Sequence, residues 1–173
     1  KNAAKKLAEN LENEYLVAPI QNSVNLTIEE IRLLGIEPSN VMIENIQARD
    51  RSSRVLAAIA ASKGGVFVNN GNKTETALGY CTLYGDVDGV FAPIADMYKG
   101  QVYEMAKLIN SNAKREIIPV EILEVVPSAE LSANQDVTKG KGDPINYPYP
   151  DKLIRAFVEW RWDIAEVLEK YDN

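Results

Sequence analysis

The chain has 173 residues, a net charge of −6 and a hydrophobic fraction of 46%. These values are ordinary for one globular domain and disfavour intrinsic disorder. The absence of histidine excludes serine–histidine–aspartate triads and histidine-ligated metals, and a single cysteine, Cys81, excludes an intrachain disulfide. The acidic balance disfavours nucleic-acid binding, and no apolar run approaches the ~18 residues of a membrane helix. We therefore expect a cytoplasmic protein with neither nucleic-acid nor membrane partners.

Apolar spacing, strand composition and the positions of Gly and Pro predict alternating helices and short strands. In chain order we expect a helix near residues 4–11, a strand over 15–20, helices over 26–34 and 41–63, a strand over 66–68, a helix over 74–84, an extended piece over 90–94, and helices over 99–109, 119–125 and 151–171. Ser39 or Asn40 is placed to cap the helix that begins near Val41. This order is typical of an α/β fold with a mainly parallel sheet flanked by helices.

The expected organisation is a core over about residues 1–131, a mobile loop over about 132–150 and C-terminal helices over 151–173. Ligands of parallel sheets bind at the carboxyl ends of the strands. The loop over residues 69–72, which follows the second predicted strand, is therefore the first place to look for a site.

The long predicted helix over residues 41–63 carries polar side chains at the edge of an inward-facing stripe. Asn45 and Arg49 are four residues apart, so they share one side of the helix. Buried polar groups need partners. The two residues either line a ligand site or are a helix-edge amide and a surface arginine, and both interpretations stay open.

The segment GNKTE, residues 71–75, also allows two interpretations. Asn72 followed three residues later by Glu75 is typical of a capping box at a helix start. Alternatively, Glu75 projects from that helix start beside a strand end and holds Mg²⁺ on a polyphosphate.

Asp86 and Lys99 are the other charged candidates. Asp86 stands in a predicted turn, YGD, where its carboxylate is able to hold an amine or ammonia. Lys99 falls in the first turn of a helix that Asp96 is placed to cap, where a cation opposes the helix dipole at a cost of about 0.3–1 kcal/mol. A phosphate bound at that helix start would explain the lysine. Cys81 is expected to be a small core residue with no base to activate it.

Several strings of residues together resemble the NAD⁺ synthetase family, most closely the synthetase domain of the glutamine-dependent form. They are NIQAR at residues 45–49, GNKTE at 71–75, LGYCTLYGD at 78–86, Lys99, and PSAEL at 127–131. In this order and spacing the strings are highly specific and span nearly the whole chain. The resemblance implies a Rossmann-like domain of the N-type ATP pyrophosphatase class that works as a homodimer or higher homo-oligomer.

The family's reaction has two steps. The nicotinate carboxylate of deamido-NAD⁺ attacks the α-phosphorus of ATP, which gives an NAD-adenylate and pyrophosphate; ammonia, free or derived from glutamine, then displaces AMP. Two anions meet in the first step, so Mg²⁺ and cationic side chains must neutralise charge. The adenylate must be shielded from water, and the loop over 132–150 would be the cover.

Carried over position by position, the resemblance implies a role for each candidate. Deamido-NAD⁺ contacts fall to Asn45, Arg49 and Glu75, the Mg²⁺ contact to Glu75, ATP contacts to Asn70, Lys99 and Ser128, and the catalytic roles to Asp86 and Lys99.

Three features depart from the family's pattern. Its pyrophosphate loop, Ser-Gly-Gly-x-Asp-Ser, is not in the sequence, Asn70 stands where the family usually has Thr, and a basic C-terminal segment is missing. Because backbone N–H groups of such loops cradle phosphate, we expect a domain truncated at its N-terminus and inactive by itself, with a glutaminase domain upstream in the parent. Two alternatives stay open: another N-type ATP pyrophosphatase, and a non-catalytic fragment that binds nucleotide or mediates subunit contacts.

Overall fold

The computed structural model describes residues 2–128, 142–143 and 145–171. Its regular elements in chain order are α1 (Asn2–Asn10), α2 (Gln21–Leu33), α3 (Asn40–Arg49), the π-helical stretch η1 (Asp50–Leu56), α4 (Ala57–Ser62), α5 (Lys73–Leu78), α6 (Lys99–Ala113), α7 (Val120–Glu124), α8 (Pro148–Ile154), the π-helical stretch η4 (Arg155–Glu159) and α9 (Ile164–Tyr171). Within the described ranges, no helix is long and apolar enough to cross a membrane.

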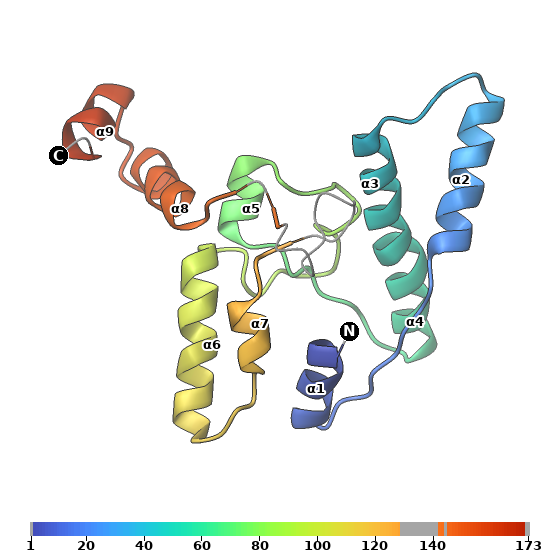
Figure 1. Cartoon of the computed structure of the whole chain (residues 1–173), viewed down its shortest axis with the longest axis horizontal. Helices are drawn as coiled ribbons and strands as arrows, with labels where there is room; N and C mark the ends of the chain where they lie inside the picture. The colour runs from blue at the N-terminus through green and yellow to red at the C-terminus, as the bar shows by residue number, and fades with distance from the viewer. Residues whose placement is uncertain (1, 129–141, 144, 172–173) are drawn as a thin grey trace.

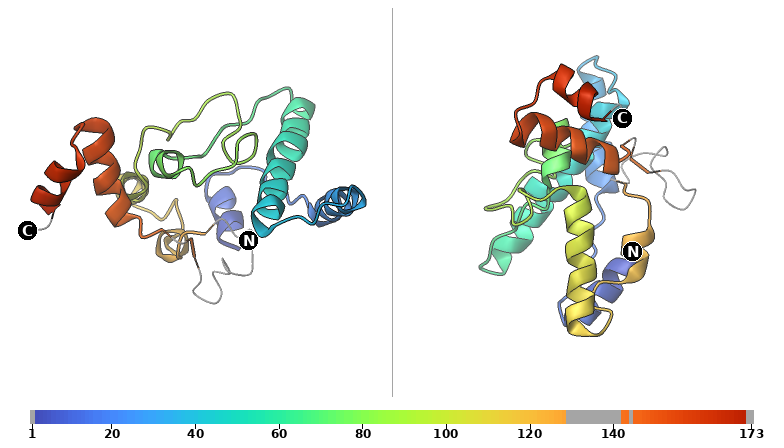
Figure 2. Two further views of the ribbon diagram at one scale, coloured as in Figure 1. Left: turned by 90° about the horizontal axis from the view of Figure 1, so that it is seen from above. Right: turned by 90° about the vertical axis from the view of Figure 1, so that its left-hand side faces the viewer.

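The molecule is elongated, with helices at both ends and irregular segments between them (Figure 1). At one end α2 packs beside the continuous rod formed by α3, η1 and α4. At the other end α8, η4 and α9 form an arm that projects beyond α6 (Figure 2). The short helix α5 lies in the middle and packs against both α6 and α8. This central junction carries the site described below.

Side chains attach the outer helices to this centre. The ammonium of Lys6 on α1 contacts Glu116 at 2.5 Å, just before α7. The arm is held by Glu159, whose Oε1 accepts hydrogen bonds from Tyr98 Oη at 2.9 Å and from Lys73 Nζ at 3.0 Å. Tyr98 is only 2% exposed, so the base of the arm belongs to the small core.

The helices form largely where the periodicity predicts them. Ser39 caps α3, because its side chain accepts the N–H of Met42. α2 begins at Gln21, earlier than predicted. The helix predicted over residues 74–84 is too long: α5 ends at Leu78, since Gly79 takes a left-handed conformation with φ of 71° that closes the helix. Most of the predicted loop over 132–150 lies outside the described residues, and residues 148–150 belong to α8.

The predicted parallel sheet is not confirmed. Residues 15–20, 66–68 and 90–94 all lie in segments without regular structure. Two of the segments still run side by side, because Val90 N–H donates to the Phe67 carbonyl at 3.1 Å and Asn69 N–H donates to the Phe91 carbonyl at 3.0 Å.

The first of the three segments lacks even this pairing. Within the described part of the chain, residues 15–18 make no backbone–backbone hydrogen bond. A parallel strand is stable when neighbours pair both of its edges and helices cover both of its faces. These segments have a strand-forming composition, but they stay irregular because the described residues do not put such neighbours in place beside them.

Candidate functional site

A cavity of about 550 Å³ opens between α3, the segment around α5 and the start of α6. Its lining includes six of the seven residues to which the resemblance assigns a binding or catalytic role, namely Asn45, Asn70, Glu75, Asp86, Lys99 and Ser128. The exception is Arg49. The structure thus brings together residues that are up to 83 positions apart in the sequence (128 − 45 = 83).

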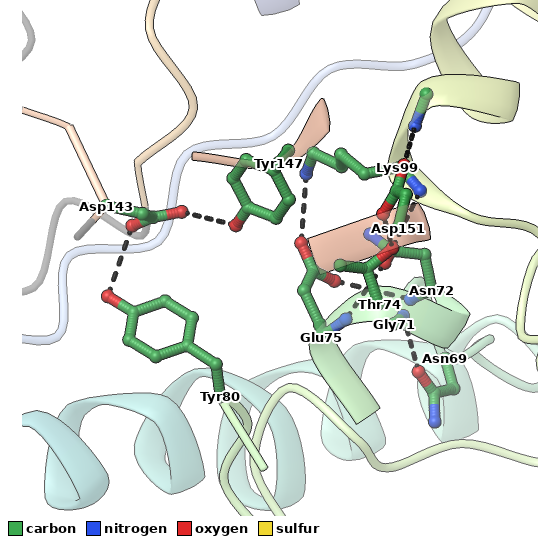
Figure 3. Close-up of polar contacts among 11 residues, drawn as sticks. Asn69, Gly71, Asn72, Thr74, Glu75, Tyr80, Lys99, Asp143, Tyr147 and Asp151 are labelled. Carbon is green, nitrogen blue, oxygen red and sulfur yellow. Dashed lines mark hydrogen bonds and ion pairs between the residues drawn. The ribbon is translucent and has the colours of Figure 1, made fainter. Parts of the chain in front are cut away.

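Glu75 and Lys99 form an ion pair in the wall of this cavity. The Lys99 Nζ lies 2.9 Å from Glu75 Oε1, and the two side chains are 20% and 21% exposed, respectively. The same ammonium lies 5.1 Å from the centroid of the Tyr147 ring, in cation–π geometry. Figure 3 shows the pair between α5 and α6. A charge pair at this depth is screened less by water than a surface pair.

The predicted capping box at α5 is confirmed. Asn72 Oδ1 accepts the N–H of Glu75 at 3.1 Å, and Glu75 Oε2 accepts the N–H of Asn72 at 3.2 Å. The cap uses one carboxylate oxygen of Glu75 and the ion pair uses the other. The two interpretations of Glu75 are therefore compatible, because the same side chain caps the helix and faces the cavity.

Lys99 is the first residue of α6, as predicted, but the prediction that Asp96 caps this helix is wrong. The N-cap is Tyr98, and Gln101 Oε1 accepts the Tyr98 N–H at 2.9 Å. Asp96 is 97% exposed at its side chain and lies 2.7 Å from Lys73 Nζ. An N-cap residue directly precedes the first residue of its helix, whereas Met97 and Tyr98 stand between Asp96 and Lys99.

The backbone donors at the start of α6 are already occupied. The N–H of Lys99 donates to Thr74 Oγ1 at 3.0 Å, and the N–H of Gly100 donates to Asp151 Oδ2 at 2.9 Å. A phosphate therefore does not need to be invoked at this helix start. The side chain of Lys99, rather than the helix N-terminus, faces the cavity.

The YGD turn lies against α3. Asp86 Oδ1 accepts the N–H of Thr82 at 2.8 Å, and Thr82 Oγ1 donates to Asn45 Oδ1 at 2.7 Å. Gly85 packs so closely that a Cβ there would lie 3.0 Å from the Cβ of Ala48. A side chain at this position would crowd Ala48 and Thr82, so glycine lets the turn lie this close to α3.

The polar edge predicted for the helix over residues 41–63 finds its partners in this turn. Arg49 Nε donates to the Leu83 carbonyl at 3.2 Å, and Ser53 Oγ donates to the Tyr84 carbonyl at 2.5 Å. Tyr84 itself has a left-handed φ of 61°, which is unfavourable for a bulky residue. Arg49 therefore contacts the back of the turn instead of lining the cavity.

Asp143 closes the cavity from the C-terminal side. Tyr147 Oη donates to Asp143 Oδ2 at 2.9 Å, and Tyr80 Oη donates to Asp143 Oδ1 at 3.2 Å (Figure 3). Burial, followed by the hydrogen bond to Asp143, raises the pKa of Tyr147 far above its usual range, so this hydroxyl stays protonated. The N–H of Asp143 donates to the Pro127 carbonyl at 2.7 Å, which places this closure beside Ser128.

Sequence reasoning missed Arg51, Asp143 and Tyr147. Arg51 lines the cavity, although helical spacing puts it on a different face from Asn45. It lies in η1, where π-helical winding shifts each side chain from its α-helical direction. No pattern in the sequence predicts the π-helical winding that turns Arg51 toward the cavity. The hydrogen bond between Asp143 and Tyr147 likewise has no sequence signal and is seen only in the structure.

Cys81 lines the same cavity. Partial burial raises the pKa of its thiol, and the negative charges of Asp86 and Glu75 raise it further. The thiol is therefore protonated at neutral pH. The prediction that Cys81 is a core residue is wrong, because its side chain is only partly buried and lines the cavity.

The carboxylates of the cavity do not form a metal cage. Within the described ranges, no group of three or more Cys, Asp or Glu side chains is arranged to hold a metal ion. Glu75 nevertheless has spare oxygen lone pairs, since a carboxylate has about four acceptor positions. This fits Mg²⁺, which binds through one or two carboxylates and takes its other ligands from phosphates and water.

Two solved structures resemble the whole arrangement. The glutamine-dependent NAD⁺ synthetase from Acinetobacter baumannii, in complex with ADP, has a TM-score of 0.68 and 28% identity, over 98% of this chain and 29% of that one. The NMN synthetase from Francisella tularensis has a TM-score of 0.73 and 26% identity, over 97% of this chain and 63% of that one. The fold is therefore that of synthetases of nicotinamide nucleotides.

Sequence comparison narrows this class to one family. The family model described as NAD synthase matches residues 1–172, and the chain belongs to the NAD synthase family. The glutamine-dependent NAD⁺ synthetase of Thermotoga maritima is 37% identical over 169 residues, which are 96% of this chain and 28% of that protein. The corresponding enzyme of Synechocystis sp. is 40% identical over 94% of this chain and 28% of its own length. The chain thus spans less than a third of these curated relatives.

Proposed function

We propose that this chain forms the substrate-binding part of an ATP-dependent amide ligase that converts deamido-NAD⁺ to NAD⁺ through an NAD-adenylate. One observation carries the proposal: the Glu75–Lys99 pair stands in a cavity that also gathers Asn45, Asp86 and Ser128. Family membership supports the reaction class. The parent would be a cytoplasmic homodimer or higher homo-oligomer. Its ammonia would come either free or from glutamine, and the names of the curated relatives support glutamine.

The cations of the cavity suit two polyanionic substrates. In the proposal Lys99 binds the phosphates of ATP, whose remaining contacts come from Asn70 and Ser128 at the rim. Glu75 would hold Mg²⁺, which neutralises phosphate charge when bound. When phosphates take the Lys99 ammonium, Glu75 loses that partner and its carboxylate becomes available to the cation. The internal ion pair therefore keeps both groups in place before substrates arrive.

Deamido-NAD⁺ would lie along α3. Asn45 would contact it directly, while Arg49 would act through the backbone of the YGD turn that it holds. Arg51, which lines the cavity, adds a cation for the dinucleotide phosphates. These assignments put the nicotinate carboxylate near Asp86.

The chemistry then follows from charge. In the first step the carboxylate oxygen forms a bond to the α-phosphorus and pyrophosphate leaves, and Lys99 stabilises the charge on the phosphates. In the second step ammonia attacks the acyl carbon and AMP leaves. Asp86 would accept a proton from the attacking nitrogen, since its carboxylate is exposed in the cavity and is fixed by the N–H of Thr82.

The decisive experiment is a calorimetric titration of the chain with deamido-NAD⁺, followed by a pyrophosphate-release assay with Mg²⁺-ATP and ammonium. We expect saturable binding of deamido-NAD⁺, and no release by this chain alone because the phosphate-cradling loop motif is not in its sequence. A chain that binds ATP but not deamido-NAD⁺ would favour the generic nucleotide-binding alternative. Release that depends on a different carboxylate would favour another N-type ATP pyrophosphatase.

A matched pair of variants tests Glu75. Gln at this position still accepts the Asn72 N–H, because capping boxes tolerate Gln. Glu75→Gln should therefore keep the fold but abolish Mg²⁺-dependent adenylation in the parent enzyme. Glu44→Gln removes another carboxylate that lines the cavity and should leave adenylation close to wild type. Adenylation close to wild type in Glu75→Gln would show that Glu75 does not belong to the site.

The likeness to an NMN synthetase supports a second candidate substrate, the acid precursor of NMN. Both substrates present the same nicotinate carboxylate, and they differ in the adenylate half of the dinucleotide. Titration with each compound separates them. Tighter binding of the dinucleotide supports NAD⁺ synthesis, and tighter binding of the mononucleotide supports NMN synthesis.

A further inference from the structure

The carboxylate of Asp151 joins three elements behind the Glu75–Lys99 pair. Its Oδ1 accepts the hydroxyl of Thr74 on α5, and its Oδ2 accepts the N–H of Gly100 on α6 at 2.9 Å. Thr74 is 0% exposed, and its hydroxyl oxygen accepts the N–H of Lys99 at 3.0 Å. Figure 3 shows Asp151, which comes from α8, at this crossing of α5 and α6.

These bonds fall next to the two charged residues. Thr74 immediately precedes Glu75, and the N–H groups held at α6 belong to Lys99 itself and to Gly100. The ion pair spans two separate helices, and long side chains lose conformational entropy when they are held in one geometry. Fixing both backbones reduces the freedom that the pair must lose when it forms.

The absence of a side chain at Gly100 leaves space for the Asp151 carboxylate to approach the first turn of α6. A Cβ at position 100 would lie 3.2 Å from Asp151 Oδ2, which is tighter than an ordinary contact. Glycine weakens a helix at its own position, so its presence in the first turn of α6 is explained by the close approach of Asp151. Asp151 does not line the main cavity, which separates it from the residues that would touch substrate.

We propose that Asp151 is a positioning residue: through Thr74 and the first turn of α6 it holds Lys99 in register with Glu75. The purpose of that register rests on the proposed function, because a phosphate-binding lysine must meet its ligand in a fixed geometry. The positioning itself is a property of the chain without ligand and is tested there.

The test compares wild type and Asp151→Ala by NMR, without nucleotide. The Lys99 ammonium lies over the Tyr147 ring, so the adjacent methylene carries a ring-current shift that reports its position. In Asp151→Ala we expect this shift to collapse and the exchange of the Lys99 amide to accelerate about tenfold or more, as for loss of a charged hydrogen bond. An unchanged Lys99 methylene shift with faster exchange only at Gly100 would reduce Asp151 to a helix cap and overturn the proposal.

Two further comparisons keep the test decisive. Thr74→Ser retains the bridging hydroxyl and should keep the Lys99 shift, whereas Thr74→Val removes it and should lose the shift even if Asp151→Ala does not fold. Lys152→Ala, one residue along α8, is the matched control and should behave as wild type. The same loss in Lys152→Ala, or retention in Thr74→Val, would contradict the proposal. Failure of the chain to bind deamido-NAD⁺ would overturn the proposed function but leave these shifts unaffected.

Discussion

At the scale of single residues, Cys81 is a natural reporter of the cavity because it is the only thiol in the chain. Burial first, and then the charges of Asp86 and Glu75, raises its pKa. At any pH below that raised value the reactive thiolate is scarcer than in free cysteine. We therefore predict slower modification by a disulfide reagent than for free cysteine at pH 8, with a rate that is still rising at pH 9–10.

The measurement is the rate of thiol modification across that pH range in the native and the urea-unfolded chain. Unfolding should remove the difference from free cysteine. Bound deamido-NAD⁺ should slow the reaction further, since the thiol lines the cavity in which the ligand is proposed to sit. A native rate equal to that of free cysteine would contradict the protonated, partly buried thiol.

Local motifs explain why some of these residues were found from the sequence. Asn72 and Glu75 are three residues apart and encode the cap directly, and the capping box forms as predicted. Tyr147 and Asp151 carry no such local signal, because each acts on residues of α5 or α6 that are far away in the chain. Residue types and spacing predict contacts within an element well, and contacts between elements only where a family pattern adds them.

At the scale of elements, α5 depends on its cap because it has only six residues. Asn72 is 1% exposed, so its removal also leaves a backbone N–H of the first turn buried without its partner. We predict that Asn72→Ala lowers the free energy of unfolding by about 1–2 kcal/mol. Asn72→Ser keeps an N-capping oxygen and should recover most of the loss in urea denaturation. Equal midpoints for Ala and wild type would show that α5 does not rely on this cap.

The contact of α2 with the α3–η1 rod has a pH dependence of its own. Ser23 on α2 donates to Asp50 Oδ2 at 2.8 Å, and Arg54 Nε donates to Asp50 Oδ1 at 2.6 Å. The hydrogen bond from Arg54, together with that from Ser23, holds the pKa of Asp50 below its ordinary value of 3.8. A lowered carboxyl pKa contributes stability above the unfolded value, and this contribution is lost as the pH falls through the folded value.

Asp50→Asn should therefore destabilise the chain at pH 7, by about 1 kcal/mol or less because the partner arginine is exposed to solvent. The difference between the variant and wild type should shrink as the pH is lowered below 4. Urea midpoints of both chains at pH 7 and pH 3 provide the measurement. A difference that is constant with pH would mean that the amide loses packing or geometry rather than charge.

The same elements show how far local pattern reaches. Helical periodicity predicts α1, α3 and α6 because an amphipathic helix satisfies its backbone hydrogen bonds internally. The segments over residues 15–20 and 66–68 have strand composition, but a strand needs hydrogen bonds from another segment. Among the residues that the structure describes, only two such bonds form beside residues 67–69. Composition predicts that a segment favours an extended conformation, whereas hydrogen-bonded pairing of strands depends on which segments lie beside it.

At the scale of the whole molecule, the exposed surface is too large for a compact monomer. The accessible area is 11752 Å², whereas a compact protein of this mass exposes roughly 8,400 Å². The excess of roughly 3,300 Å² exceeds the ~1,600 Å² that a standard protein–protein interface buries. Apolar side chains contribute to this surface, since Leu33 is 87% exposed and Ile164 is 70% exposed.

The arm carries one exposed apolar stripe through which a second molecule could cover part of this surface. On α9, Ile164 and Leu168 lie one turn apart and are 70% and 53% exposed, whereas Val167 on the inner face is 7% exposed. A second copy of the chain is able to cover this stripe, and a net charge of −6 is too small for repulsion to prevent contact at physiological salt.

We predict that the chain self-associates at micromolar concentration, with a light-scattering mass above 19.2 kDa. The double variant Ile164→Ser, Leu168→Ser should shift the mass toward the monomer, because it removes the apolar area that drives association. Leu33→Ser removes a comparable exposed side chain at the opposite end of the molecule and should leave the mass unchanged. A monomeric wild-type chain would show that the exposed apolar surface does not drive self-association, and an effect of Leu33→Ser alone would place the interface on α2 rather than on the arm.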